Sequence, residues 1–348
     1  MFRRLFLIVH ILLALRVSAQ PGWSSVQAHE WYALQGWIVG CNYIPGYAVN
    51  QIEMWQPETF DTVAINRELQ WAQQIGFNTV RVFLHYAVWA DDPDGFRERM
   101  DIFLNLCSHH FIRAIPVLFD DCWNSHAYTG PQPPPVPGVH NSRWVQCPGD
   151  SLSGDVTAIS DFEKYTRDII RQFRYDSRIL MWDLYNEPGN SNYFSYSLLL
   201  LQWSFIWARE INPIHPLTCG VWNFDARYDS LNSFSIENSD IITFHHYGDT
   251  AGLKEVIGKL QPFNRPLICT EYLARNRNSR FETHLPVFKR YAIGAINWGL
   301  VSGKSQTIYP WESKEGSPEP DVWFHDIFRS DGTPFSPDEA SFIRQITR

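Results

Sequence analysis

The stretch I-L-M-W-D-L-Y-N-E-P-G, residues Ile179 to Gly189, begins as an apolar run and ends on a glutamate followed by a proline. The length and composition of the run are typical of a buried strand. Proline cannot continue a central strand, so the strand ends before Pro188 and presents Glu187 at its rim. Glutamate is rarely buried without a partner or a function. The alternative is a solvated side chain in an ordinary turn, and the rest of the chain must decide between the two.

Strands and helices alternate on both sides of this stretch. Seven further strands are expected at about 35–43, 78–84, 112–119, 216–222, 241–245, 266–270 and 293–298. Helices are expected at about 60–75, 96–109, 156–175, 193–211, 226–233, 253–260, 280–291 and 337–346. Eight strands, nearly all followed by helices, predict a single-domain (β/α)8 TIM barrel. The alternative is an open doubly wound sheet, which normally has a glycine-rich nucleotide loop after its first strand; residues 41–46, C-N-Y-I-P-G, lack that pattern.

The N-terminus has the features of a secretory signal peptide. Arg3 and Arg4 precede an apolar run from Leu5 to Leu15, and Val17-Ser18-Ala19 is a small-residue cleavage site. The run is too short to span a bilayer comfortably. The sequence therefore predicts a signal peptide at residues 1–19, a catalytic domain at 20–348 and a secreted protein without membrane insertion.

Composition narrows the choice of partners. The formal net charge is −8, which disfavours nucleic acid and anionic membranes as partners. The chain contains 15 tryptophans, more than packing usually requires. Their flat, half-apolar rings suit the faces of sugars, although a tryptophan-rich core is the alternative.

The long segment Asp120–Gly154 is expected to be irregular because it contains six prolines. A loop of this length in a compact domain is usually functional or disordered, so it is either a wall of a binding cleft or a loose insertion. Cys122 and Cys147 bracket most of it and predict a disulfide in an exported protein. No C-x-x-C pair is present, so the cysteines predict no metal site.

In a TIM barrel the catalytic residues are carried by the C-terminal ends of the strands. The strand ends supply the candidates Arg81, Asp121, Trp123, Asn186, Glu187, His245, Tyr247, Glu271 and Trp298. The two glutamates follow the fourth and seventh strands and face each other across the barrel mouth. Two carboxyl groups about 5–5.5 Å apart perform glycoside hydrolysis with retention of configuration.

These motifs resemble clan A glycoside hydrolases, most closely glycoside hydrolase family 5, over nearly the whole chain after the signal peptide. The matching residues are Arg81 in N-T-V-R, Asn186-Glu187-Pro188, His245-His246-Tyr247, Thr270-Glu271-Tyr272 and Trp298. The resemblance implies that Glu187 is the general acid/base and Glu271 the nucleophile. It also implies a β-linked oligo- or polysaccharide substrate and no metal or organic cofactor.

The resemblance assigns the supporting residues as well. Asn186 would bond the sugar 2-hydroxyl, Arg81 and Tyr247 would keep Glu271 ionised, His245 would line the floor, and Trp298 would lie under the sugar. The third strand departs from the family, because Phe119-Asp120-Asp121 stands where a histidine is common. Asp121 and Trp123 are nevertheless expected to bind substrate, Asp121 through hydroxyls at the non-reducing end. Further tryptophans serve either as sugar platforms or in packing: Trp144, Trp222 and Trp311.

The function expected from the sequence is a secreted retaining β-glycosidase, with β-mannosides or β-glucosides favoured as substrates. A non-catalytic carbohydrate-binding barrel is one alternative, although such proteins usually lose one of the two glutamates. A transglycosylase that uses the same covalent intermediate is another. Endo or exo action depends on whether the segment Asp120–Gly154 closes one end of the cleft.

Overall fold

The computed structural model describes residues 22–150 and 158–348, so the expected signal peptide lies outside the described residues. Parallel strands form one eight-stranded sheet in the order β5-β4-β3-β2-β1-β8-β7-β6. The strands are β1 (Val39–Tyr43), β2 (Thr79–Phe83), β3 (Arg113–Asp120), β4 (Trp182–Asn186), β5 (Leu217–Thr218), β6 (Ile242–His245), β7 (Leu267–Glu271) and β8 (Gly294–Trp298).

The gap between β5 and β6 is closed by a short parallel bridge just beyond β5. Val221 pairs with Phe244; the Val221 N–H donates to the Thr243 carbonyl at 2.9 Å, and the His245 N–H donates to the Val221 carbonyl at 3.0 Å. The Thr218 and Thr243 hydroxyls also meet at 2.8 Å. The sheet therefore closes on itself, and the predicted TIM barrel is confirmed.

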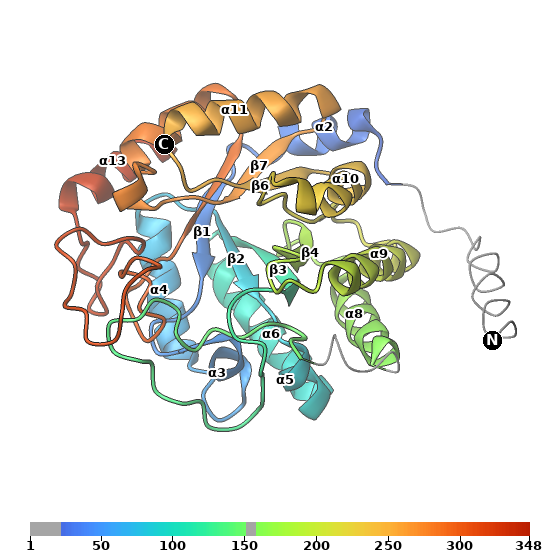
Figure 1. Ribbon diagram of the computed structural model, residues 1–348, viewed down its shortest axis with the longest axis horizontal. Helices are drawn as coiled ribbons and strands as arrows, with labels where there is room; N and C mark the ends of the chain where they lie inside the picture. The colour runs from blue at the N-terminus through green and yellow to red at the C-terminus, as the bar shows by residue number, and fades with distance from the viewer. Residues whose placement is uncertain (1–21, 151–157) are drawn as a thin grey trace, which may run out of the picture.

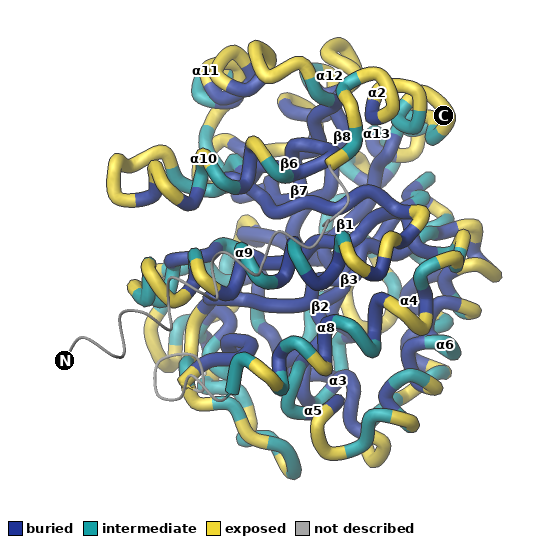
Figure 2. Tube along the Cα trace, turned by 90° about the vertical axis from the view of Figure 1, so that its right-hand side faces the viewer, coloured by how far each residue is buried: buried dark blue, intermediate teal, exposed yellow. Residues whose placement is uncertain are grey.

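Helices surround the barrel (Figure 1). They are α2 (Ser25–Ala33), α3 (Gln51–Trp55), α4 (Thr62–Gln74), α5 (Tyr86–Asp91), α6 (Pro93–His109), α8 (Ile159–Phe173), α9 (Phe194–Ile211), α10 (Asp229–Asn238), α11 (Thr250–Leu260), α12 (Phe281–Arg290) and α13 (Pro337–Thr347). Polar residues fix where several begin: Asp61 caps α4, and Asp92 caps α6 ahead of Pro93. The strands are buried while the outer helix faces are exposed (Figure 2).

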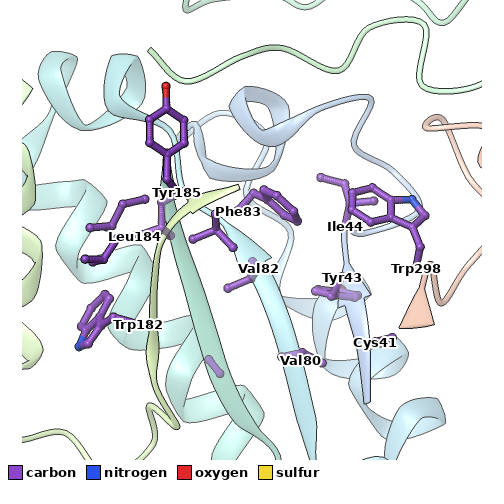
Figure 3. Packing of buried hydrophobic residues seen from close by; sticks show 14 of the residues in the cluster. Cys41, Tyr43, Ile44, Val80, Val82, Phe83, Trp182, Leu184, Tyr185 and Trp298 are labelled. Atoms are coloured by element: carbon purple, nitrogen blue, oxygen red, sulfur yellow. The ribbon is translucent and has the colours of Figure 1, made fainter. Parts of the chain in front are cut away.

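The apolar core lies in two layers. The larger layer lies mainly between strands and helices and includes Tyr43, Val82 and Leu184; Trp298 extends it to the barrel mouth (Figure 3). A second cluster lies apart from it and comprises Ala28, Ile38, Ile115, Leu180, Met181, Ile241, Ile268 and Ile296. Four of these residues stand just before a strand, three lie at the second or third position of one, and Ala28 of α2 joins them. Helix α2 therefore covers the N-terminal end of the barrel and leaves the C-terminal end for the site.

Some elements differ from the sequence expectation. Helices α2, α3 and α5 were not predicted, because they are short or lack a clear apolar stripe; α2, for instance, buries only Ala28. Strand β5 is only two residues long because the chain leaves the sheet before its bridge at Val221. Of the helix expected at 156–175, residues 156 and 157 lie outside the described residues, and α8 begins at Ile159.

The disulfide predicted between Cys122 and Cys147 is absent, and all six cysteines are free and buried. Asp120 and Cys147 instead exchange two backbone hydrogen bonds of 2.8 Å, which close the loop without a covalent link. The Cys147 thiol accepts from the Tyr86 N–H at 3.2 Å, whereas the Cys122 thiol lines the cavity at the barrel mouth. The two sulfur atoms thus lie in different environments and have different contacts.

Within the parts of the chain that the structure describes, no helix combines the length and the hydropathy needed to cross a membrane.

Candidate active site

A cavity of about 440 Å³ lies at the C-terminal ends of the strands, and Glu187 and Glu271 both line it. Glu187 directly follows β4, and Glu271 is the last residue of β7. One carboxylate oxygen of each lies within 4.8 Å of the other. This short separation is close to the spacing of about 5–5.5 Å that favours a covalent glycosyl intermediate over attack by an intervening water.

Glu187 is held in a left-handed backbone conformation, with φ of 46°. A residue other than glycine stores about 1–3 kcal/mol there, so the surrounding structure must impose the turn. Asp121 does so: its Oδ2 accepts the Gly189 N–H at 2.6 Å. Its two oxygens also accept the hydroxyls of Tyr185 and Ser197, at 2.7 and 2.6 Å.

The predicted role of Asp121 in binding sugar hydroxyls is therefore corrected. Asp121 is only 2% exposed, its oxygens are taken by protein donors, and it does not line the cavity. The residue supports the turn that presents Glu187. Cys122, the next residue, is the one that reaches the site, and its thiol donates to Glu187 Oε2 at 3.2 Å.

Glu271 receives a hydrogen bond on each oxygen. Arg81 Nη1 donates to Oε1 at 2.8 Å, and the Tyr247 hydroxyl donates to Oε2 at 2.7 Å. Arg81 is fully buried and is itself held by Asp183 through two contacts of 2.9 and 2.8 Å. A carboxylate anchored in this way is fixed in orientation, and both donors favour its ionised form.

Asn186 and His245 connect the two halves of the site. Asn186 Oδ1 accepts from Arg81 Nη2 at 2.7 Å, and its Nδ2 donates to Asp120 Oδ1 at 2.8 Å. His245 Nδ1 lies 2.8 Å from Glu187 Oε1 and 3.4 Å from Glu271 Oε2. Burial lowers the pKa of His245 to about 4, so the ring is neutral at pH 7 and its Nδ1–H donates to the glutamates.

The environments of the two glutamates separate their protonation states. Burial raises the pKa of both carboxyl groups. Arg81 and Tyr247 oppose this rise at Glu271, whereas Cys122, Asn190 and Arg81 oppose it at Glu187. The Arg81 guanidinium contacts Glu271 directly, at 2.8 Å, which favours ionisation of Glu271 ahead of Glu187. One ionised and one protonated carboxyl group at the same pH would suit a nucleophile and an acid.

Aromatic side chains form much of the cavity surface. Trp298 is 8% exposed and packs against Phe83 and Trp144, at ring distances of 5.6 and 5.5 Å. Trp123, Trp222 and Trp311 also line the cavity. Trp144 does not; its Nε1 donates to Asp120 Oδ2 at 2.6 Å, which makes it a packing residue.

The structure thus brings together every candidate from the strand ends except Asp121, with Arg81 lying beneath the cavity surface. Sequence reasoning missed further cavity residues, namely Cys122, His140, Asn141, Asn190 and His325. Asn190 had a local signal, because it stands three residues after Glu187 and donates to its Oε2 at 2.6 Å. His140, Asn141 and His325 had none, since they lie in long loops far from any strand end.

Glu187, His245 and Glu271 are also the residues whose donor atoms cluster closely enough to hold a metal ion, among those that the structure describes. Arg81 and Tyr247 already occupy the oxygens of Glu271. A guanidinium beside a carboxylate neutralises the charge that a cation would need. The arrangement therefore suits proton transfer and nucleophilic attack better than metal binding.

Comparison with protein families identifies a match over residues 43–303 to the family model described as cellulase, glycosyl hydrolase family 5. No curated protein sequence is detectably similar to the chain.

Solved structures share the fold at low sequence identity. A family 5, subfamily 18 protein from Streptomyces cattleya, in complex with GlcNAc, superposes with a TM-score of 0.61 at 12% identity, covering 89% of this chain and 79% of that one. An endo-β-1,4-mannanase from Thermotoga petrophila superposes with a TM-score of 0.56 at 16% sequence identity; the match covers 89% of this chain and 76% of the mannanase chain. An exo-β-1,4-mannosidase from Opitutaceae bacterium strain TAV5 superposes with a TM-score of 0.58 at 17% identity; the match covers 89% of this chain and 59% of the mannosidase chain.

Proposed function

Since the chain belongs to glycoside hydrolase family 5, a retaining family that acts on β-linked sugars, we propose that it is a secreted β-mannosidic hydrolase with Glu187 and Glu271 as its catalytic residues. The observation that carries the proposal is the pair of carboxyl groups within 4.8 Å at the mouth of the barrel. Each lies in the environment that its role requires.

The first chemical step forms a covalent intermediate. Glu187 gives its proton to the glycosidic oxygen while a Glu271 oxygen attacks the anomeric carbon from the opposite face, so the C–O bond to the leaving sugar breaks. The product is an α-linked glycosyl ester of Glu271 and a free leaving sugar. Arg81 and Tyr247 hold the attacking carboxylate in line and stay in place as its charge is consumed.

The second step releases the sugar. Glu187, now ionised, takes a proton from a water molecule as the water oxygen attacks the anomeric carbon, and the ester bond to Glu271 breaks. Two inversions give net retention of the β configuration. The hydrogen bonds from Cys122 and Asn190 to Glu187 Oε2 stabilise the ionised form that this step needs.

The sugar at the cleavage point is proposed from the structures that share the fold and from the family model. Two of the structures that share the fold are named as a β-mannanase and a β-mannosidase, which favours a β-mannoside. The description of the matching family as cellulase favours a β-glucoside, which we keep as the second candidate. Asn186, next to the acid, is the residue assigned to the 2-hydroxyl at which mannose and glucose differ.

A substrate panel tests the proposal. We expect hydrolysis of 4-nitrophenyl β-mannoside with kcat/KM at least about tenfold above that of the β-glucoside, since one misplaced hydroxyl contact costs on the order of 1.4 kcal/mol. The β-xyloside and β-galactoside should be poorer still. Glu271→Gln, which keeps the shape of the side chain but removes the nucleophile, should abolish every rate. A reversed order would favour the glucoside, and inactivity of the wild type on all four would contradict the function.

Secretion is supported by Arg3, Arg4 and the apolar run from Leu5 to Leu15. We expect the full chain, expressed with its own leader in a secreting host, to appear in the medium with Gln20 as its first residue, because cleavage follows small residues such as Ala19. N-terminal sequencing checks this. A variant with Arg3 and Arg4 replaced by glutamate should remain in the cell; retention of the unaltered, uncleaved chain would contradict secretion.

A further inference from the structure

One side of the cavity is closed by two loops that are joined to each other. His140 and Asn141 come from the loop after β3, and Trp311 and His325 come from the segment after β8. We call these four residues the glycone wall. The loops meet through many hydrogen bonds, so the wall is a fixed part of the fold.

The side chain of Gln306 makes three of these hydrogen bonds. Its Nε2 donates to the carbonyls of Val136 and Val139, at 2.7 and 3.1 Å, and its Oε1 accepts the Gly138 N–H at 2.9 Å. Backbone hydrogen bonds on both sides continue the contact, from Asn141 N–H to the Ser305 carbonyl and from Gly316 N–H to the Pro137 carbonyl, each 2.9 Å. Opening the wall would break all of them at once.

The glycone wall stands directly behind the nucleophile. Tyr247, which donates to Glu271, packs against Trp311 at a ring distance of 5.0 Å and against His325 at 5.6 Å. His140 continues the wall and meets His325 at 5.3 Å. Only the Tyr247 ring therefore separates Glu271 from Trp311 and His325, so the wall lies close to the nucleophile.

The roles of the two glutamates say which part of the substrate faces the wall. Glu271 attacks the sugar that is retained as the glycosyl ester, whereas Glu187 protonates the oxygen of the leaving sugar. The leaving sugar thus lies on the side of Glu187. There the cavity is bordered by Trp222, whose Nε1 donates to the Pro188 carbonyl at 3.3 Å, and by Phe224, which is 37% exposed. Phe224 offers exposed aromatic surface for further sugar units on this side, while beside the wall Trp123, 47% exposed, packs against His140 at a ring distance of 5.6 Å.

The glycone wall presents hydrogen-bond acceptors. Asn141 is 2% exposed, and its Oδ1 has no partner in the protein. His140 Nδ1 lies 2.7 Å from the Tyr309 carbonyl, and His325 Nδ1 contacts the Leu273 carbonyl. Each Nδ1 therefore carries a proton, which it donates to that carbonyl. Burial lowers the pKa of both histidines, so each ring is neutral and its unprotonated Nε2 is an acceptor. Sugar hydroxyls are the matching donors, and among the residues that the structure describes no lysine or arginine lines the cavity to bind a carboxylate.

From this geometry we infer that the enzyme is exo-acting: it removes one neutral sugar at a time from the non-reducing end of a β-linked chain, with Asn141 binding a hydroxyl of the terminal sugar. The inference rests on the proposed function and refines it. The closed glycone side admits the chain end, while the open side beyond Glu187 receives the remainder of the chain.

The test uses β-1,4-mannopentaose and β-1,4-glucopentaose with a fluorescent label at the reducing end, with and without a methyl group on O4 of the terminal sugar. We expect early products to be the free monosaccharide and the labelled tetrasaccharide. The methylated substrate should react at least about tenfold more slowly, because the wall leaves no room for the added group. Early release of unlabelled di- or trisaccharide, or equal rates with and without the methyl group, would overturn the inference while leaving the hydrolase function standing.

Absence of any cleavage would instead overturn the proposed function, and the inference with it. A variant pair tests the residue assignment. Asn141→Ala should lower kcat/KM for the aryl β-glycoside by about tenfold, the value of one hydrogen bond. Because Asn141 has a φ of 45°, which alanine adopts less readily, the melting temperature should fall by a few degrees while the variant stays folded at assay temperature. Asn105→Ala, the same change on the exposed face of α6, should leave kcat/KM unchanged. Equal rates for Asn141→Ala and the wild type would remove Asn141 from the site.

Discussion

Glu271→Ala is expected to lower kcat for the preferred aryl β-glycoside by about 10⁵-fold, the order of loss that follows deletion of a covalent nucleophile. Among the described residues, the acidic side chains that line the cavity are Glu187 and Glu271, so no third carboxylate stands ready to replace Glu271. The fold should persist, because Arg81 keeps its paired contacts with the buried carboxylate of Asp183. Assays of product formation on the purified variant check the loss of kcat, and thermal melting checks that the fold persists.

Azide makes this prediction specific for the nucleophile. In Glu271→Ala the small side chain leaves space below the anomeric carbon, and azide entering there attacks once, with inversion. The product is the α-glycosyl azide, identifiable by the proton coupling at the anomeric carbon. Glu282→Ala, an exposed glutamate at the start of α12, serves as the control and should retain full activity. Activity of Glu271→Ala above about a tenth of the wild type, or formation of the β-azide, would assign the nucleophile elsewhere.

The barrel and the two glutamates were predictable because their signals are local. An apolar run that ends in Asn186-Glu187-Pro188 specifies a buried strand and its rim within one short stretch, and the same holds for the run that ends at Glu271. The structure places both residues at the barrel mouth, with Arg81 and Tyr247 in contact with Glu271.

The roles of the residues at the end of β3 were harder to predict from sequence, because a turn decides which of three neighbouring side chains faces the cavity. Asp120 anchors Asn186, Asp121 supports the turn of Glu187, and the Cys122 thiol contacts the Glu187 carboxyl group. The sequence assigned the sugar contact to Asp121 and a disulfide to Cys122. Neither error is visible in composition or spacing, since the direction of each side chain depends on hydrogen bonds to residues more than 60 positions away.

The glycone wall could not be predicted from the sequence for a related reason. His140 and Asn141 sit in a proline-rich loop without periodicity, and they acquire their positions from the segment around Gln306, about 165 residues further on. A proline-rich composition indicated a stiff loop. Only the pairing of the two loops shows that it closes one side of the cavity.

Glu187→Ala should produce a loss that depends on the leaving group. For a sugar leaving group we expect kcat/KM to fall by about 10²- to 10⁴-fold, the usual contribution of a general acid. For 2,4-dinitrophenyl glycosides the first step needs no protonation, so the glycosyl ester forms and accumulates, and its slow hydrolysis limits the rate. Azide should restore turnover here by attacking that ester. Because this follows an earlier inversion, the product is the β-glycosyl azide, opposite to the product from Glu271→Ala.

The dependence of kcat/KM on pH is a second measurement on Glu187→Ala. Burial raises the pKa of Glu187, and the wild-type enzyme needs this group protonated, so kcat/KM should fall as pH rises through that raised value. On the acidic side kcat/KM should fall as Glu271 becomes protonated. Glu187→Ala, assayed on the dinitrophenyl substrate, should lose the basic limb and keep the acidic one, because the nucleophile still titrates beside Arg81 and Tyr247. A basic limb that survives in Glu187→Ala would mean that another group supplies the proton.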